Sequence, residues 1–465
     1  MKWMPTIVVL VLAVLSLAAL LYLRPGDAGR PAGDVRRGPL FAAGQVPVDQ
    51  ITGITLKRGD DPALVFQREG DTWSQVEPFA YPMDPFSVRQ LAVQVAQLDA
   101  VDEAQLDGEA GFSAAALALD PPEAVLTLQW PDGSLALQLG RRGIAGRAYL
   151  RVQGEQTVHV VNQALHDRAV EMDVREWRDR RIFHGAGVES DRIERVEGGS
   201  RLVLERELRQ WSVREPVETR LDPVAADEIF HAVGNAQIGG FILDEPDSTA
   251  LERFGLAAPV ATFEIVTGRP AREGEQISRV TETQRLLVGS TIGAGSLERF
   301  GMIEGRPVVV RLTVPVLQAL FPPPQNLIDP TASGVNPADV MSLRIRGPEG
   351  ELVLRRDLER WLAPNAGPDG GDLELHAPHV QELLDQLTDL RAPAVEIQVY
   401  PRDLEIATIT MYGHGRRPLD TVRIAREPDT GRWALENGDN VLRIFQDSLA
   451  MRLTPADFGI PADSP

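Results

Sequence analysis

The chain has 465 residues, too many for one compact core, and its 43% hydrophobic and 25% charged residues are typical of a globular protein. The formal net charge of -20 argues against nucleic-acid binding, because phosphate recognition needs clustered Lys and Arg. Cysteine is absent, which excludes disulfides, thiolate metal sites, cysteine nucleophiles and a lipidated N-terminal cysteine.

An uncharged apolar run, Pro5–Leu23, opens the chain. As a helix, its 19 residues would extend roughly 28 Å, close to the hydrocarbon thickness of a bilayer. A cleaved signal peptide usually has a shorter apolar core of roughly 7–15 residues, followed by a small-residue cleavage site. We therefore predict a transmembrane signal anchor over residues 1–24, with cleavage near Ala28 as the alternative.

The charges around this run and the layout of the chain favour opposite orientations. Lys2 precedes it, whereas Arg24, Arg30, Arg36 and Arg37 follow it, so the positive-inside rule alone would place the long C-terminal part in the cytoplasm. A short tail, one span and a long globular part are instead the usual layout of an exported, anchored protein. We predict a single-pass protein of the cell inner membrane whose bulk is extracytoplasmic (periplasmic). Residues 25–45, rich in Gly, Pro and Arg, are expected to form a flexible tether.

Residues 46–174 form the first of three related segments. Short apolar runs that lead to Trp73 predict antiparallel strands joined by Gly-Asp turns. Asp84 then offers a helix N-cap, and Pro85 suits the first helical position. Apolar residues recur at helical spacing and predict one buried helix face: Val88, Leu91, Val95 and Leu98.

The same landmarks return in residues 175–325 and 326–465. Trp211 precedes Asp222 by 11 residues, the spacing that separates Trp73 from Asp84. In the third copy, the insertion NAGPDGG (365–371) lies between Trp361 and the next helical pattern, and the copy is shortened. Periods of 138 and 150 residues between the tryptophans are too long for a solenoid unit. The predicted fold class is α+β: an N-terminal transmembrane helix followed by three tandem antiparallel-sheet-plus-helix repeats.

Five features of these repeats also occur together in a known family. They are Ile51–Leu56 with Trp73 and Pro78, the helix after Asp84, the lead-in Phe254-Gly255-Leu256 with Pro259, the Leu-rich strand that ends at Gly140 or Gly289, and the junction Arg178–Arg181. Together they resemble the bacterial family of domain of unknown function 4340, over nearly the whole chain after the anchor. The resemblance implies a membrane-anchored, extracytoplasmic protein whose relatives are neighbours of ABC-transporter components of the gliding-motility auxiliary type. It supplies no catalytic residues.

Recurring polar and aromatic residues have both a chemical and a structural interpretation. Trp73, Trp211 and Trp361 could be sugar-stacking platforms, but a tryptophan at a fixed place in each repeat is more often a packing residue. Asp84 and Asp222 could be the carboxylates of a glycoside hydrolase, but their position before proline identifies them as helix caps.

Other candidate motifs are incomplete. His376 and His379 flank Pro378 and favour an exposed helix start over a metal site. Gly289–Ser296 lacks the Gly-Lys-Ser/Thr ending of a phosphate loop, and Asp369–Asp372 does not fit calcium-loop spacing. The basic cluster Arg175–Arg181 favours a junction paired with neighbouring acids over a lipid or partner contact. The sequence thus predicts no catalytic, cofactor-binding or metal-binding residue.

The preferred functional interpretation is a non-catalytic scaffold or accessory subunit, because the repeated scaffold carries no repeated polar constellation. Its expected partners are the cytoplasmic membrane, through Pro5–Leu23, and an ABC-transporter or other envelope protein, with no nucleic acid. The alternative is a module that binds envelope glycan or another polymer through aromatic residues such as Trp130, Trp177 or Trp433. An envelope hydrolase is a third hypothesis, with no motif in its favour.

Overall fold

The computed structural model describes residues 38–105, 113–187, 189–273, 276–367 and 369–461. The predicted anchor, residues 1–24, and the first part of the predicted tether lie outside these ranges. Within the described ranges, no helix has the length and apolar character needed to cross a membrane. The chain divides after Arg178 into two compact units, of which the second contains two sheets.

The described part of the first unit contains one ten-stranded antiparallel sheet, in the order β1-β6-β10-β9-β8-β7-β2-β3-β4-β5. Its strands are β1 (Gly38–Pro39), β2 (Gly53–Arg58), β3 (Leu64–Glu69), β4 (Thr72–Glu77), β5 (Tyr81–Met83), β6 (Asp99–Gln105), β7 (Ala124–Trp130), β8 (Gly133–Arg142), β9 (Arg147–Val152) and β10 (Thr157–Asn162). Two helices, α2 (Pro85–Ala96) and α3 (Ala164–His166), complete it. Because β1 pairs with β6 and Phe41 is buried, this fold begins within the predicted tether.

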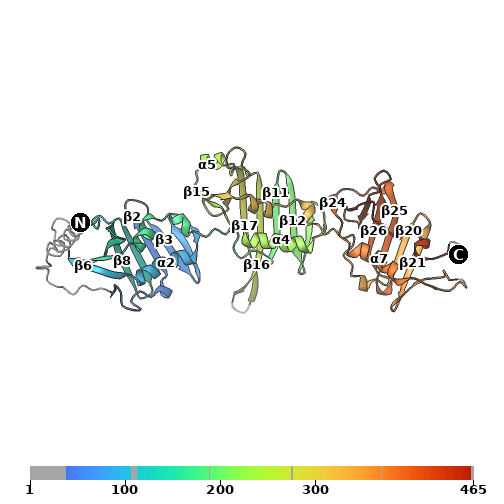
Figure 1. Ribbon diagram of the computed structural model, residues 1–465, viewed down its shortest axis with the longest axis horizontal. Helices are drawn as coiled ribbons and strands as arrows, with labels where there is room; N and C mark the ends of the chain where they lie inside the picture. The colour runs from blue at the N-terminus through green and yellow to red at the C-terminus, as the bar shows by residue number, and fades with distance from the viewer. Residues whose placement is uncertain (1–37, 106–112, 188, 274–275, 368, 462–465) are drawn as a thin grey trace, which may run out of the picture. The chain divides into compact units, whose positions relative to one another are not determined.

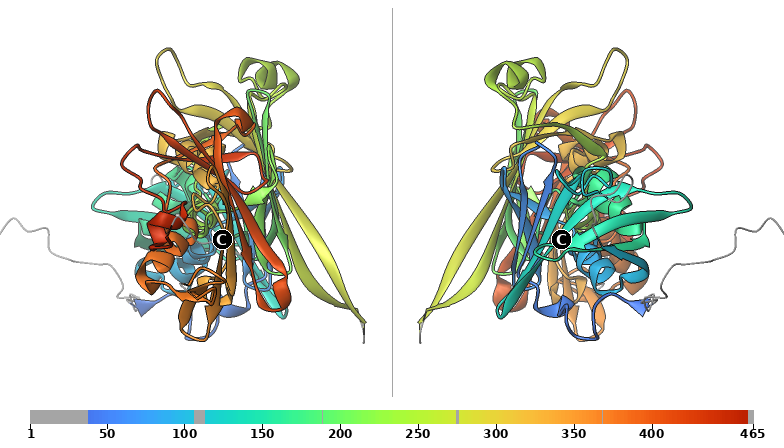
Figure 2. Two further views of the ribbon diagram at one scale, coloured as in Figure 1. Left: turned by 90° about the vertical axis from the view of Figure 1, so that its right-hand side faces the viewer. Right: turned by 90° about the vertical axis from the view of Figure 1, so that its left-hand side faces the viewer.

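The second unit begins with a nine-stranded antiparallel sheet, in the order β14-β13-β12-β11-β16-β17-β18-β19-β15. Its strands are β11 (Ser190–Glu197), β12 (Ser200–Glu207), β13 (Gln210–Glu215), β14 (Thr219–Arg220), β15 (Gly240–Asp244), β16 (Ala261–Glu273), β17 (Gln276–Thr291), β18 (Arg299–Ile303) and β19 (Val308–Leu312). Its helices are α4 (Pro223–Asn235), α5 (Ser248–Arg253) and α6 (Val314–Leu320). The β16–β17 hairpin projects beyond its sheet, since β11 pairs with β16 only as far as Thr267 (Figure 2).

The last sheet also has nine antiparallel strands in the described residues, in the order β23-β22-β21-β20-β25-β26-β27-β28-β24. They are β20 (Ser342–Gly347), β21 (Gly350–Asp357), β22 (Arg360–Ala363), β23 (Leu373–Glu374), β24 (Ala394–Ile397), β25 (Glu405–Tyr412), β26 (Pro418–Arg426), β27 (Trp433–Glu436) and β28 (Val441–Phe445). Its helix is α7 (Ala377–Thr388). Although the third repeat is shorter in sequence than the second, its sheet has as many strands.

Apart from β1, the three sheets have one topology, and strand register shows which residues are equivalent. Trp73, Trp211 and Trp361 occupy the same place, opposite Arg68, Arg206 and Arg356, respectively. One long helix belongs to each sheet (Figure 1). The structure therefore confirms the predicted α+β class with three antiparallel sheets.

The positions of helices α2, α4 and α7 follow from the topology of their sheets. In each repeat the helix joins a strand at one edge of the sheet to a strand at or next to the other edge, so it crosses one face. The crossing buries one apolar stripe of the helix; on α2 this stripe is Val88, Leu91, Ala92 and Val95. Apolar strand residues of the same face complete the core beneath it, among them Ile54, Leu56 and Leu126.

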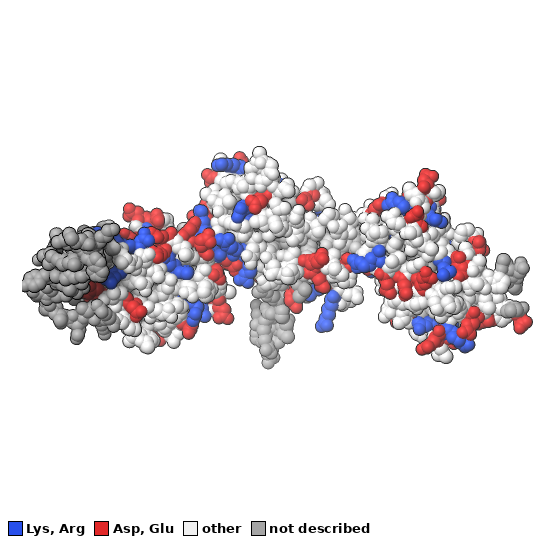
Figure 3. Space-filling view, in the orientation of Figure 1, with Lys and Arg blue, Asp and Glu red and all other residues white. Residues whose placement is uncertain are grey.

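On the opposite face, acidic and basic side chains alternate across neighbouring strands. Arg201 of the second sheet contacts Glu194 at 2.9 Å and Glu215 at 2.6 Å, and Arg192 contacts Glu194 at 2.6 Å. Opposite charges on adjacent strands stabilise a solvated sheet face modestly. Figure 3 shows that acidic and basic side chains are also interspersed on the described surface that faces the viewer.

Part of this second face is covered by the lead-in that precedes the central hairpin. The carbonyl oxygen of Phe254 accepts a hydrogen bond from the Ser290 backbone at 2.9 Å, and that of Leu117 accepts one from Arg141 at 2.8 Å. A Cβ atom at Gly289 or Gly140 would lie 2.2 or 2.4 Å from these carbonyl oxygens, respectively. The recurrent glycine of the Leu-rich strand therefore provides room for the lead-in. The third sheet has Ala425 at the equivalent position, in the repeat whose sequence lacks the Phe-Gly-Leu lead-in.

We expect Gly289→Ala to destabilise the second sheet by about 1–3 kcal/mol, because the new methyl group must displace the Phe254 carbonyl. The free energy of unfolding of the full chain in urea measures the effect. Gly371→Ala is the matched control, since no atom lies within 4 Å of its Cβ position. Equal unfolding midpoints for the two variants would show that the close approach does not constrain this position.

Candidate interaction site at the junction of the second and third repeats

The recurrent aspartates are helix caps, as predicted. Asp84 accepts a hydrogen bond from the Ser87 backbone at 3.0 Å, at the start of α2. Asp222 accepts one from the Val224 backbone at 3.2 Å, at the start of α4. Each carboxylate satisfies a helix N–H that has no partner within its own helix.

The recurrent tryptophans differ in exposure. Trp73 and Trp361 are buried, which confirms their interpretation as packing residues. Trp211 is only partly buried and lies against Phe230 of α4, with ring centroids 4.8 Å apart. The second repeat therefore exposes an aromatic side chain that the equivalent residues of the other repeats keep inside.

The tryptophans considered for glycan binding do not share one surface. Trp177 and Trp433 are buried, and Trp130, at the end of β7, is partly exposed. Two of these three residues are thus core residues, and glycan stacking would need an exposed ring face.

The remaining candidate motifs serve local structure. His376 is the N-cap residue of α7, and its ring lies 4.5 Å from that of His379 in an edge-to-face pair. Within the described ranges, no group of three His, Cys, Asp or Glu residues is placed to hold a metal ion. Gly293 and Gly295, with φ of 81° and 79°, lie in the loop between β17 and β18.

The basic cluster at the end of the first unit is built into both units. In the first unit, the buried Arg178 guanidinium lies over the rings of Phe79 and Tyr81, at 5.0 and 5.3 Å. In the second unit, Asp179 accepts hydrogen bonds from the backbone and guanidinium of Arg181. Burial alone would raise the pKa of Asp179, but the hydrogen bonds from Arg181 lower it below its usual value.

The linking segment, residues 327–330, joins the second and third repeats and forms backbone hydrogen bonds with both. On one side, the Leu327 carbonyl accepts a hydrogen bond from the Asp222 backbone N–H at 2.9 Å, and the Asp329 backbone N–H donates to the Arg220 carbonyl at 3.0 Å. On the other side, the Pro330 carbonyl accepts a hydrogen bond from Ala392, just beyond α7, at 3.1 Å. The segment is therefore part of both repeats.

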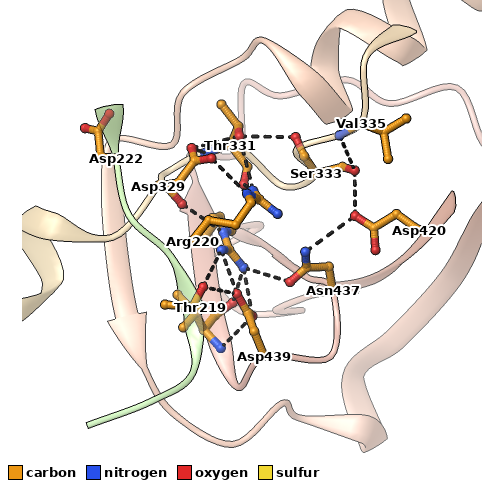
Figure 4. Close-up of polar contacts among 12 residues, drawn as sticks. Thr219, Arg220, Asp222, Asp329, Thr331, Ser333, Val335, Asp420, Asn437 and Asp439 are labelled. Atoms are coloured by element: carbon orange, nitrogen blue, oxygen red, sulfur yellow. Dashed lines mark hydrogen bonds and ion pairs between the residues drawn. The ribbon is translucent and has the colours of Figure 1, made fainter. Parts of the chain in front are cut away.

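A buried arginine anchors the third repeat at this junction. Arg443 of β28 has 0% of its side chain exposed and forms two bonds to the Asp439 carboxylate, at 2.9 and 2.8 Å. It also donates to the Asp329 carbonyl at 3.2 Å, and Asp439 accepts a hydrogen bond from Thr219 of the second repeat at 2.5 Å (Figure 4). The buried charge of the third repeat is thus satisfied in part by atoms of the second repeat and the linking segment.

Two further ion pairs hold the same junction. Arg220 of β14 donates to the Asp329 carboxylate at 2.9 Å and to the Thr331 carbonyl at 2.6 Å (Figure 4). Arg391, after α7, forms two hydrogen bonds to Asp222, the cap of α4, at 3.1 and 2.5 Å. The cap residue that recurs in sequence therefore has a second function here, which is to bind the next repeat.

The electrostatics of the junction favour the ionised form of the Asp329 carboxylate. Burial would raise the pKa of Asp329, but hydrogen bonds from the Thr331 backbone and from Arg220 lower it below its usual value. The hydrogen bond to Asp222 raises the pKa of Arg391. Both directions indicate ion pairs that are formed in the folded protein.

Beside this network, residues of both repeats line an open groove with a volume of about 1280 Å³. Trp211, Phe230 and Leu221 of the second repeat form its apolar part, and the turn 437–440 of the third repeat forms another wall. Leu208, on the β12–β13 turn, lines the groove and is 100% exposed. This surface combines an aromatic floor, a protruding aliphatic residue and a polar rim, a composition typical of protein–protein contacts.

The turn that carries Leu208 is conformationally strained. Leu208 and Arg209 have φ of 48° and 74°, and left-handed backbone costs a side-chain-bearing residue about 1–2 kcal/mol. The equivalent turn of the first repeat has Gly70 with φ of 61°, which avoids this cost. Among the described residues, Arg209 has no ion-pair partner, so the turn presents an exposed leucine beside a free guanidinium.

Sequence reasoning missed this junction. Thr219 and Arg443 are 224 residues apart, and no local pattern links them. The one sequence signal for the contact with Asp222 was Arg391, an arginine shortly after the helix of the third copy. An arginine after a helix is too common to be a specific signal.

A family model supports the repeat structure independently. The model described as a domain of unknown function (DUF4340) matches residues 73–251 and again residues 211–405. The matches begin at Trp73 and Trp211, so the model starts at the same point of two successive repeats, and together they cover more than half of the chain. No curated protein matches the chain.

We expect Arg443→Met to destabilise the second unit by about 3–5 kcal/mol, because it leaves the Asp439 carboxylate buried without its cation. Arg346→Met is the control, since Arg346 is 66% exposed and its pair with Glu351 should contribute at most about 1 kcal/mol. Urea unfolding of the full chain, followed by tryptophan fluorescence, compares the two. Similar losses of stability would mean that the buried pair does not hold the junction.

Proposed function

The chain belongs to the family of domain of unknown function DUF4340, and from this premise we propose that it is a non-catalytic scaffold outside the cytoplasmic membrane. Residues 1–24 anchor it in the cell inner membrane, and its folded repeats bind a protein of an envelope or ABC-transporter complex. In this proposal the second and third repeats act together, because one groove is built from both.

The groove beside Trp211 is the observation that carries this proposal. The strained turn at Leu208 and Arg209 has an energetic cost and places an aliphatic and a cationic side chain in water. Contact with a partner protein would bury the leucine and pair the guanidinium, which offsets that cost. The Arg443 network supports the same proposal, because a fixed junction presents the groove in one shape and reduces the ordering cost of binding.

Glycan or polymer binding is the second candidate, and Trp211 is the observation in its favour. A partly exposed indole in an open groove could stack on a sugar ring. The protruding Leu208 and a polar rim with charges of both signs are more typical of a protein contact, which is why we prefer the scaffold.

The location is testable with a single cysteine, because the chain has none of its own. In Leu208→Cys, the new thiol takes the place of a fully exposed side chain. We expect a membrane-impermeant maleimide to label it in intact spheroplasts as completely as in lysed cells. Labelling that requires lysis would place the repeats in the cytoplasm and overturn the proposed location.

Partner binding is testable with the same variant. A benzophenone maleimide attached at residue 208 should crosslink the full-length protein to one envelope protein on illumination, because this position borders the groove. Leu358→Cys is the matched control: Leu358 is exposed on the equivalent turn of the third repeat, with φ of 55°.

We expect the crosslink at 208 to be at least tenfold stronger than at 358, and to be lost when Trp211→Ala is added. Crosslinks of equal strength at both turns would refute a specific groove contact. Crosslinking to glycan in place of protein would favour the second candidate.

A further inference from the structure

The second repeat has an arginine in its core where the other repeats have an aliphatic side chain. Arg195 is 4% exposed, and its equivalents Leu56 and Ile345 are fully buried. Register establishes the equivalence, because the three residues pair across the first hairpin with Leu202, Leu64 and Leu352, respectively. All three side chains lie on the sheet face that the long helix covers.

The Arg195 side chain has no hydrogen-bond partner among the described residues, and its Nη1 atom is buried. Its guanidinium lies 5.9 Å from the ring centroid of Phe321, which directly follows α6. Burial lowers the pKa of Arg195, and the charge of Glu197 only partly opposes this. A buried cation without a bonded anion is costly, and cation–π attraction to a phenylalanine offsets only part of the cost.

A cavity of about 450 Å³ lies between α6 and the sheet of the second repeat. Ala261 and Val288 of the sheet and Leu317 of α6 provide apolar walls. Phe321 is shared by both features, since it lines the cavity and also lies over Arg195. Phe321 therefore connects the cavity lining to the buried guanidinium, which does not itself line the cavity.

The mouth of the cavity carries a second cation. Arg299 lines the cavity and donates to the Gly289 carbonyl at 3.1 Å, and the described part of the chain gives it no carboxylate partner. Leu297, also part of the lining, is 71% exposed. Glu197 is the one acidic residue of the lining. An apolar cavity of this size, with Arg299 in its lining and Arg195 beneath the lining residue Phe321, suits a ligand with a hydrocarbon chain and an anionic end.

We propose that the second repeat binds an anionic amphiphile in this cavity, with the hydrocarbon chain against the apolar walls and the anionic group bonded to Arg195 and Arg299. In the bound state, the Phe321 side chain turns away from Arg195 and opens the inner end of the cavity. A fatty-acid carboxylate and a lipid phosphate share this chemistry.

Three ten-carbon probes separate the contribution of the anionic group to binding from that of the hydrocarbon chain. Decanoate, decyl phosphate and decanol are titrated calorimetrically into the full chain in lipid nanodiscs, with empty nanodiscs as the blank. We expect one of the anions to bind saturably and at least tenfold more tightly than decanol. Preference for decanoate identifies a fatty-acid site, and preference for decyl phosphate identifies a lipid-phosphate site.

Arg195→Leu restores the residue that the first repeat has at this position, so the fold should tolerate it. It should weaken binding of the preferred anion at least tenfold and leave decanol binding unchanged. The exposed Arg346→Leu is the control and should change neither. Should Arg195→Leu fail to fold, Arg299→Leu at the mouth is expected to weaken anion binding several-fold.

Stability distinguishes a ligand site from a structural arginine. Without probe, Arg195→Leu should keep the thermal unfolding midpoint or raise it by roughly 2–4 °C, because it removes an unsatisfied buried charge. Equal affinity of the wild-type protein for anions and decanol overturns the proposal. So does unchanged anion binding by Arg195→Leu, or a lowered unfolding midpoint in that variant without loss of anion binding.

Discussion

The helix that crosses each sheet from edge to edge is the constraint on which the rest of each repeat depends. It fixes which face of the sheet is apolar, since strand residues beneath it must form a core while those on the other side meet water or the lead-in. The crossing also requires the helix to start at a sheet edge. An aspartate before proline caps that start, as Asp84 and Asp222 do. Because the helix begins at a sheet edge, its cap is available to whatever lies beyond that edge, as Arg391 demonstrates.

The junction between the second and third repeats illustrates how buried charge favours one arrangement. Arg443 and Asp439 would leave hydrogen-bonding capacity unused in an isolated third repeat, because Thr219 and the Asp329 carbonyl complete their set. A displaced arrangement would keep the desolvation cost and lose those bonds. The network therefore specifies the orientation of the two repeats more than it adds to their stability, and the groove beside it has a defined shape.

The sequence predicted features that depend on nearby residues. The caps Asp84 and Asp222 and the buried Trp73 and Trp361 were predicted correctly, because turn chemistry and packing against the neighbouring helix determine them. The partly exposed Trp211 was not predicted, since its surroundings include a turn of the next repeat more than 200 residues away. The hydrogen bond from Thr219 to Asp439 likewise joins residues 220 positions apart, so no motif search finds it.

Arg195 was predictable from the sequence in part. Its place two residues after Ile193, where Leu56 follows Ile54, is visible when the copies are compared strand by strand. Its burial is not, because that depends on how α6 and Phe321 pack against the sheet. Comparison of internal repeats thus identifies the unusual residue, while only the structure identifies the cavity that Phe321 also lines.

The short outermost strands have a consequence for the behaviour of the chain in concentrated solution. β1, β14 and β23 have two residues each and β5 has three, so these sheet edges offer few free backbone groups to another strand. Pro39 and Pro82 lie in two of these strands and remove a donor from each. Large antiparallel sheets with long open edges can associate edge to edge and aggregate. Four of the six outermost strands thus limit such pairing, and β15 and β24, with five and four residues, form the two longer edges.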